Sequence, residues 1–520
     1  MSGLPATHTG EVPTQRGRVR HRSSRPHPVP DADSTRPDLT LVRDVDSPAP
    51  PENPENPENP ARPTRPANPA EGRHRRPPDP RGSYGAVLRI REFRWLAGAQ
   101  ALSFLGDQFA QVAIALLVYG RTGSPLLTAV AYALTYLPPI AGGPLLSGLA
   151  DRFPRRRIMV ICDLIRVVTV GLMALAGMPF WALCALLVIT VLLGAPFFSA
   201  RAALLPDILP AGQLGIGAAI SNILHQSTQI FGFVAGAAVV AALGPYRTLQ
   251  LDALTFVASA VIALMALKRR PAPASLPADG QEHPAGHARP ARHRRTGGKH
   301  TPPRGLPARQ PGSGLRIVFG NETLRTLVFF GWLAGFYVVP EGLAAPYARA
   351  LGGNEITVGL LMASVPAGTA LGAMLIGRLA RPSTQLWAMG WLAVMSCAPL
   401  VVSAWDPPLW AVLPLWVLAG VGGAFQIIAI PAFSRALTPA TRGRAFGVAQ
   451  SGLYAVQGAG ILAGGVLASV FGAPAAVGLS GMAGVITAAG LALMWTRLRR
   501  AVIASQRPPK AALTAGRACS

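Results

Sequence analysis

The chain has 520 residues, of which 50% are hydrophobic and only 14% are charged, and this balance excludes a soluble globular protein. The net charge of +25 does not indicate a nucleic-acid partner, because the basic residues lie in tails and loops between apolar segments and form no folded basic face. Four cysteines show no paired spacing, so we predict free thiols and neither a disulfide framework nor a metal site.

The first 85 residues are rich in Pro, Arg and Asp and contain a threefold Pro-Glu-Asn repeat over residues 51–60. They have too little apolar surface to offset the entropy of an ordered chain, so residues 1–85 are predicted to form a disordered cytoplasmic tail. The segment also lacks the apolar core of a signal peptide.

Apolar segments of about the length that a helix needs to cross a bilayer fill most of the remaining chain. In the first half, residues 86–267, they lie at about 93–119, 125–147, 157–177, 180–203, 214–243 and 247–267. In the second half, residues 317–497, they lie at about 324–348, 356–379, 384–405, 408–432, 444–471 and 474–497. The sequence therefore predicts an all-α polytopic membrane protein with twelve transmembrane helices in two six-helix halves.

The segments outside the two halves are basic. Residues 268–316 contain eleven Lys or Arg against two acidic residues, which predicts a basic cytoplasmic linker, and residues 498–520 are predicted to form a cytoplasmic tail. With both termini inside, the short cytoplasmic loops hold ten arginines and the outer loops three. The positive-inside rule thus predicts a multi-pass protein of the cell membrane with both termini in the cytoplasm.

A short polar loop between the second and third spans carries a recognisable motif. Leu149, Ala150, Asp151 and Arg152 are followed by two more basic residues, Arg155 and Arg156. This loop resembles the one between helices 2 and 3 of the major facilitator superfamily, although Ser147 and Pro154 stand where that pattern has glycines. The resemblance implies the major facilitator fold, a substrate site between the two halves, and transport by alternating access.

Further runs in the first half resemble the bacterial efflux branch of that family, which includes enterobactin exporters and macrolide-efflux-like carriers. They are Phe104 to Gln108, Gly123 to Leu126, Asp163 to Arg166 and Ala200 to Asp207. The likeness implies export of an amphiphilic small molecule, such as an antibiotic, secondary metabolite or siderophore.

The resemblance also implies a conformational latch at the cytoplasmic ends of the helices. In the family the motif aspartate helps to hold the two halves in the outward-facing form. The matching residues here are Asp151, Arg152, Arg155, Arg156 and, at the start of span 11, Arg444. Asp163 and Arg166 lie three residues apart, so they could pair with each other or lend partners to Asp151.

Span 1 carries a polar stripe, because Ser103, Asp107 and Gln111 recur every four residues. Asp107 is the candidate for proton coupling, since a buried carboxyl can take up and release a proton as a cavity changes sides. The alternative is a structural carboxyl that is hydrogen-bonded to a neighbouring helix.

Polar and aromatic side chains on other spans are candidates for lining a central cavity. They are Gln111, Tyr132, Tyr136, Asn222, Gln226, Gln229, Trp332, Tyr337, Gln450, Tyr454 and Gln457. The alternative is that these groups join helices by hydrogen bonds or packing. His225 is interpreted as a structural group, and Glu341 as a weaker coupling candidate that is a solvated residue at the outer gate.

The sequence favours a proton-coupled secondary exporter that needs no cofactor other than a proton gradient. No phosphate-binding loop occurs, and no clustered acids or histidines suggest an enzyme. We expect a monomer whose partners are a small-molecule substrate and the lipid bilayer. A nutrient importer or uniporter, and a non-transporting receptor or scaffold on the same fold, remain alternatives.

Overall fold

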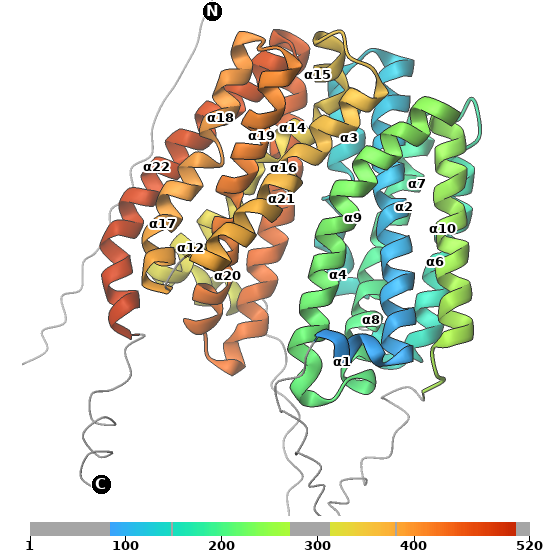
Figure 1. Ribbon diagram of the computed structural model, residues 1–520, viewed down its shortest axis with the longest axis horizontal. Coiled ribbons are helices and arrows are strands. Elements are labelled where there is room, and N and C mark those ends of the chain that lie inside the picture. Colours follow the sequence, from blue (N-terminus) through green and yellow to red (C-terminus); the bar gives the residue numbers. More distant parts are fainter. Residues whose placement is uncertain (1–83, 147–148, 271–312, 380–381, 506–520) are drawn as a thin grey trace, which may run out of the picture. The chain divides into compact units, whose positions relative to one another are not determined.

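The computed structural model describes residues 84–146, 149–270, 313–379 and 382–505, and all regular structure in them is helical (Figure 1). The predicted tail of residues 1–85 lies almost wholly outside the described residues, and so does most of the predicted linker, residues 268–316. Helix α22 continues to Ser505, beyond the predicted end of the second half at residue 497, and residues 506–520 are not described.

The first half begins with a short helix and continues through six spans, two of which are broken. Its elements are α1 (Tyr84–Arg89), α2 (Arg91–Thr122), α3 (Pro125–Ala133), α4 (Pro138–Leu146), α5 (Leu149–Arg152), α6 (Arg155–Met173), α7 (Phe180–Leu192), α8 (Gly194–Ile208), η1 (Ala211–Gln213), α9 (Leu214–Leu243) and α10 (Pro245–Ala266).

The second half is more often interrupted. Its elements are α11 (Ser313–Phe319), α12 (Glu322–Trp332), α13 (Ala334–Tyr337), α14 (Val339–Gly342), α15 (Ala344–Ala350), α16 (Glu355–Leu379), α17 (Pro382–Met395), α18 (Ala398–Val401), η3 (Val402–Trp405), α19 (Leu409–Gly423), α20 (Phe425–Arg435), α21 (Pro439–Phe471) and α22 (Ala473–Ser505).

Eleven helical segments within the described residues are long and apolar enough to span a membrane. The predicted span at 157–177 corresponds to α6, which is not among them because its 19 residues include five charged ones. Three of these are Arg155, Arg156 and Arg157 at its start, and the other two, Asp163 and Arg166, are buried inside the protein. The two charges in the middle of helix α6 are therefore turned toward protein and not toward lipid.

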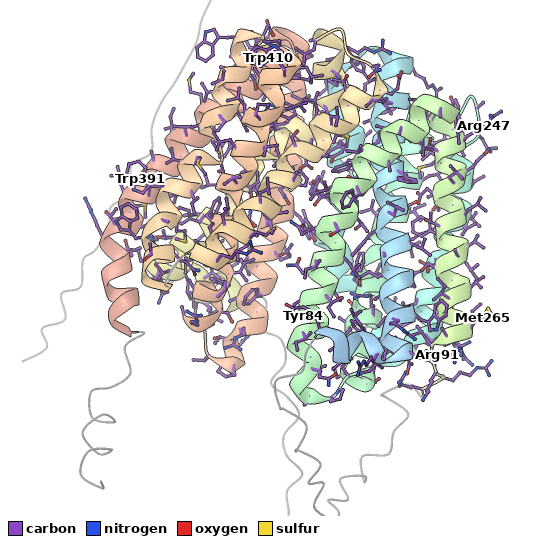
Figure 2. The ribbon with its side chains drawn as sticks, in the orientation of Figure 1. Tyr84, Arg91, Arg247, Met265, Trp391 and Trp410 are labelled. Atoms are coloured by element: carbon purple, nitrogen blue, oxygen red, sulfur yellow. The ribbon has the colours of Figure 1, made fainter. Side chains whose placement is uncertain are left out.

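Large apolar side chains on the outer surface agree with a lipid environment. Met265, Trp391 and Trp410 are each more than two thirds exposed, and Figure 2 shows them pointing away from the helices. In water such side chains would be costly, whereas in a bilayer they meet hydrocarbon or the headgroup layer.

Within each half, some helix pairs pack together more extensively than others. In the first half, α10 packs against both α2 and α6, and α2 packs against α9. In the second half, α16 packs against α19, and α17 packs against α22. Most buried apolar residues belong to one core cluster that draws on both halves.

The two halves meet mainly along two helix pairs, α9 with α16 and α3 with α21. A Cβ on Gly359, near the start of α16, would overlap with Ala237 on the second half of α9. A Cβ on Gly465, near the end of α21, would overlap with Ala129 of α3. Small residues thus let the halves approach closely at the end of the bundle that is remote from α1 (Figure 1).

Candidate functional site

Two broken spans, one from each half, meet at a carboxylate. The Oη of Tyr132 donates a hydrogen bond to Oε2 of Glu341 at 3.2 Å, and the Oη of Tyr136 donates to the same oxygen at 3.5 Å. Tyr132 also lies 3.3 Å from Oε1 of Gln111 on α2. We call Gln111, Tyr132, Tyr136 and Glu341 the interface group, because it joins the two halves through side chains alone.

Proline positions the two tyrosines. The span that begins at Pro125 stops being helical after Ala133 and resumes at Pro138, which has no backbone N–H and disfavours helix at the residue before it. Tyr132 lies in the last turn of α3 and Tyr136 lies in the break itself. Their rings are 6.1 Å apart, so both hydroxyl groups reach the same carboxylate.

Glu341 lies in a comparable break in the second half. The seventh span consists of the short helices α12, α13 and α14, and Pro340 stands at the start of α14. The prediction of a solvated gate residue is wrong, because only 6% of Glu341 is exposed and its carboxylate is covered by the two tyrosines. Broken helices that meet at mid-membrane commonly form the binding sites of transporters.

A second polar group, buried inside the first half, surrounds Arg166 of α6. Its Nε donates to the carbonyl oxygen of Thr190 at 3.2 Å, and its guanidinium lies 5.5 Å from the ring centre of Phe197 and 5.2 Å from that of Phe256. Aromatic faces attract a cation, so these contacts hold the charge in place without neutralising it.

Three carboxyl groups come within the electrostatic reach of Arg166. Asp163 on α6 accepts a hydrogen bond of 2.7 Å from Ser259 on α10, and Asp252 on α10 accepts one of 3.3 Å from Thr255. Asp107 on α2 also interacts with the charge of Arg166. We call Asp107, Asp163, Arg166 and Asp252 the arginine group; among the described residues, its side chains form no direct ion pair.

Several atoms of the arginine group have no hydrogen-bond partner although they are buried. They include Oδ1 of Asp163, Oδ2 of Asp252 and Nη1 of Arg166. Oγ of Ser103 on α2 is also buried without a hydrogen-bond partner. Unpartnered polar atoms in a protein interior are costly, and they concentrate at sites with a functional role. Within the described part of the chain, no three Asp, Glu, His or Cys side chains are close enough together to hold a metal ion.

The other predicted cavity residues are distributed over both halves. The indole of Trp332 donates to the carbonyl oxygen of Ala449 at 3.1 Å, so it joins α12 to α21, and the hydroxyl of Tyr337 accepts from Gln426. Asn222 and Gln450 are exposed. The remaining candidates, Gln226, Gln229, Tyr454 and Gln457, are half-buried.

The predicted latch is described only in part. Asp151 lies in α5, but its side chain is outside the described residues. Arg155 pairs with Asp207 and donates to the carbonyl oxygen of Ala203 at 2.8 Å, while Arg156 donates to that of Leu264. Arg152 and Arg444 are exposed. Two of the arginines therefore join helices within the first half, and a contact between halves at this loop stays a prediction.

Asp252 and Gln426 were not singled out by the sequence analysis. Asp252 is the one acidic residue in the apolar span of α10, so the argument that selected Asp107 would have selected it too. Of the two alternatives left open for Asp163 and Arg166, direct pairing is not found, because Asp163 is bonded to Ser259 and Arg166 to Thr190.

Comparison with known proteins places this chain in a transporter family. The family model described as Major Facilitator Superfamily matches residues 96–345 and 341–517. YfiS of Bacillus subtilis, named an uncharacterized MFS-type transporter, is 30% identical over 168 residues, which are 32% of this chain and 40% of that protein. Macrolide efflux protein A of Streptococcus pyogenes is 29% identical over 167 residues, 31% of this chain and 40% of its own length.

A longer alignment joins the chain to the multidrug efflux pump Tap of Mycobacterium tuberculosis, which is 26% identical over 397 residues, 72% of this chain and 86% of that protein. Among solved structures, a bacterial homologue of the lysosomal transporter Spinster in an inward-facing conformation has a TM-score of 0.59 at 15% identity and covers 80% of this chain and 99% of its own. A bacterial homologue of the iron transporter ferroportin has a TM-score of 0.58 at 14% identity, covering 79% and 99%.

Proposed function

Because the chain belongs to the Major Facilitator Superfamily and is a secondary transporter, we propose that it exports amphiphilic small molecules from the cytoplasm in exchange for protons. The single observation that carries the proposal is the interface group, in which a carboxylate from the second half is buried against two tyrosines from the first. Any rocking of one half against the other has to break or remake these hydrogen bonds.

The interface group can respond to both a proton and a ligand. When Glu341 is ionised it accepts from both tyrosines, and when it is protonated it needs fewer of these hydrogen bonds. Protonation therefore weakens a contact between the halves and favours the conformational change. A ligand with a hydrogen-bonding group competes for the same hydroxyl groups, which ties substrate binding to the same contact.

Asp107 supplies the second proton site of the proposal. It lies one helical turn before Gln111 on α2, so the arginine group and the interface group follow one another along the same helix. The order Asp107, Gln111, Tyr132, Glu341 offers a polar route from the interior of the first half to the boundary between the halves. The positive-inside rule supports the proposal that the α1 end of the helices faces the cytoplasm.

The residues around the interface group favour an amphiphilic ligand. Tyr132, Tyr136 and Tyr337 offer ring faces and hydroxyl groups, and Gln111 offers an amide. Mixed aromatic and amide linings suit small molecules that are apolar with a few polar groups. The names of the two efflux relatives, macrolide efflux protein A and multidrug efflux pump Tap, support the same class.

The test measures accumulation of fluorescent amphiphiles and a macrolide in an efflux-deficient bacterial host, with and without a protonophore. We expect the intact protein to lower accumulation, and Asp107→Asn and Glu341→Gln each to reduce that effect at least about tenfold, because each removes one of the proposed proton sites. Asp406→Asn and Glu322→Gln are the controls, because they make the same chemical changes at exposed positions.

The outcomes separate the parts of the proposal. Loss in both site variants at equal membrane abundance, with the controls unchanged, supports coupling through the two carboxyls. Export that survives both substitutions and the protonophore would overturn proton coupling. Higher accumulation with the intact protein would reverse the proposed direction.

A further inference from the structure

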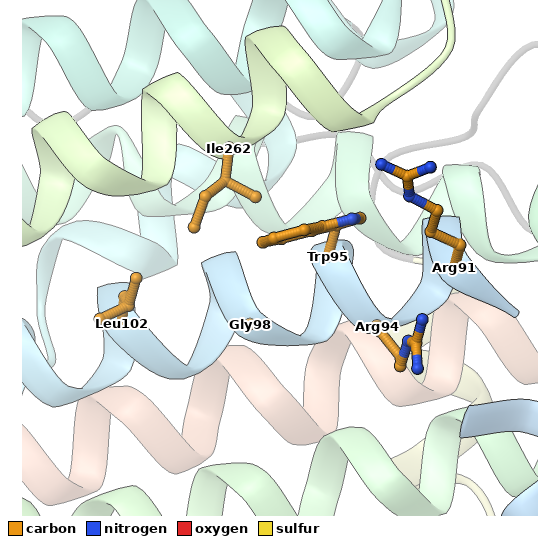
Figure 3. A pocket seen from close by; sticks show the side chains of 6 residues that line it. All are labelled: Arg91, Arg94, Trp95, Gly98, Leu102 and Ile262. Carbon is orange, nitrogen blue, oxygen red and sulfur yellow. The ribbon is translucent and has the colours of Figure 1, made fainter. Parts of the chain in front are cut away.

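A pocket of about 450 Å³ opens between the start of α2 and the end of α10, and none of the residues of the two polar groups lines it. It is lined by Arg91, Arg94, Trp95, Gly98, Leu102 and Ile262. Figure 3 shows the indole of Trp95 lying between Arg91 on one side and Leu102 and Ile262 on the other. The pocket therefore has a cationic end and an apolar end, separated by an aromatic ring.

The cationic end is not neutralised by the acidic residue next to it. Both oxygens of Glu92 are bound by the guanidinium of Arg270, at 2.6 and 3.0 Å, and the backbone N–H of Lys268 donates to it at 3.1 Å. In the described parts of the chain, no carboxylate or carbonyl oxygen accepts a hydrogen bond from the guanidinium group of Arg91 or Arg94. Two exposed guanidiniums thus remain available for an anion from outside the protein.

The apolar end is open toward the side of the bundle. Trp95 is 44% exposed, and a Cβ on Gly98 would meet no atom within 4 Å, so a glycine here leaves a groove along the helix. Ile262 lines the opposite wall from α10, whose neighbouring residue Met265 is 83% exposed. An acyl chain could lie in this groove with hydrocarbon on its outer side.

The length of α2 sets the depth of the pocket in the bilayer. The helix has 32 residues and is about 48 Å long, whereas the hydrocarbon layer is about 30 Å thick. Its first turns, which carry Arg91 and Arg94, therefore lie in the headgroup layer. Gly98 and Leu102 follow one and two turns later, where the headgroup layer gives way to the hydrocarbon.

We propose that this pocket binds an anionic phospholipid, with the phosphate held by Arg91 and Arg94 and one acyl chain lying over Trp95 and Gly98 toward Leu102 and Ile262. The proposal needs the chain to span a membrane, but it does not depend on substrate, direction or proton coupling. A free phosphate would use only the cationic end, and a zwitterionic lipid would bring an ammonium group close to two guanidiniums.

Each arginine near an anionic membrane surface contributes about 1 kcal/mol, so removing both lowers affinity about thirtyfold. The experiment measures retention of phosphatidylglycerol by the full-length protein with native mass spectrometry, after purification in detergent. The competing probes are phosphatidylcholine and inorganic phosphate. The variants are Arg91→Gln with Arg94→Gln, and Gly98→Leu, which fills the groove while keeping both charges.

The matched control is Arg435→Gln with Arg442→Gln, which removes two exposed arginines from the second half. We expect the intact protein and the control to retain phosphatidylglycerol. The affinity of the double arginine variant for this lipid should be about thirtyfold lower. Gly98→Leu should lose it as well while still eluting as a single species in size exclusion.

Three results would overturn the proposal. One is equal retention of phosphatidylcholine and phosphatidylglycerol, because then the arginines do not select the headgroup. Another is displacement of the lipid by millimolar inorganic phosphate together with full retention in Gly98→Leu, which would leave only an anion site. The third is an equal loss in the control, which would assign the effect to overall charge.

Discussion

The two halves share a six-span layout but differ in the kind of group that lies against some of their glycines. In the first half, two glycines make room for polar side chains: a Cβ on Gly106 would overlap with the carboxylate of Asp252, and one on Gly194 would lie 2.8 Å from Nη2 of Arg166. In the second half, several glycines instead bring backbones together, and a Cβ on Gly368 would overlap with the carbonyl oxygen of Val417.

Gly460 of α21 also lies against backbone, unlike Gly106 and Gly194, because a Cβ there would overlap with the carbonyl oxygen of Gly335. The first half therefore has an interior of buried charge, and the second has one of close helix packing with a carboxylate, Glu341, at its boundary. A transporter needs groups that change charge and surfaces that slide, and this chain assigns these tasks unequally.

The largest effect should follow loss of the only cation in the arginine group. Arg166→Met leaves Asp107, Asp163 and Asp252 without a counter-charge, and breaking a buried charge arrangement costs about 3–5 kcal/mol. Adding Asp163→Asn should restore part of that loss, because one of the unpaired carboxylates is then gone. The free energy of unfolding in mixed micelles with sodium dodecyl sulfate measures both variants.

Arg157→Met, at an exposed position of the same helix, is the control and should change that free energy by less than about 0.5 kcal/mol. If the double variant is simply the sum of the two single ones, Arg166 acts by packing against Phe197 and Phe256 and not by its charge.

A smaller effect should separate two glycines. Gly368→Ala places a methyl group against the backbone of α19, which cannot move without the helix, so we expect a loss of about 1–3 kcal/mol in the free energy of unfolding. Gly106→Ala meets the ends of the Asp252 and Thr255 side chains, which can turn away. Compared with Gly368→Ala, Gly106→Ala should lower the free energy of unfolding less and should reduce export more.

Both glycine variants are measured in the unfolding assay and in the accumulation assay, at matched membrane abundance. Equal losses of stability for the two would show that the first half is as tightly packed as the second, and would remove the contrast between the halves.

The spans and their order could be predicted from hydrophobic length alone, and the structure confirms an all-helical membrane protein of this fold. The stripe through Asp107 and Gln111 follows from helical spacing, which is local information, and Tyr132 and Tyr136 were predicted only as separate cavity candidates. The partner of these tyrosines could not be found in this way. Glu341 is 209 residues from Tyr132, and no pattern in the sequence indicates which broken spans meet.

Asp163 and Arg166 show a second limit of spacing arguments, because spacing can suggest a contact that the folded protein does not form. Their separation by three residues allows an ion pair on one helix face, yet each is bonded to a different neighbouring helix. Burial in a bundle surrounded by lipid gives every polar atom several possible partners, and tertiary packing decides among them. Asp252 was accessible from sequence, because it is a lone acid in an apolar span.

The smallest effect should appear where a glycine has neither kind of neighbour. Gly171 on α6 and Gly490 on α22 would each place a Cβ in open space, with no atom within 4 Å. Alanine is favoured over glycine inside a helix by about 0.5–1 kcal/mol, so Gly171→Ala and Gly490→Ala should each raise the free energy of unfolding by that amount and leave export unchanged. Equal gains would show that the contrast between the halves comes from the neighbours of each glycine and not from the half that contains it. A loss at Gly490 in bilayers but not in micelles would instead reveal a helix from outside the chain against α22, and the second half would then be tightly packed on its outer face as well.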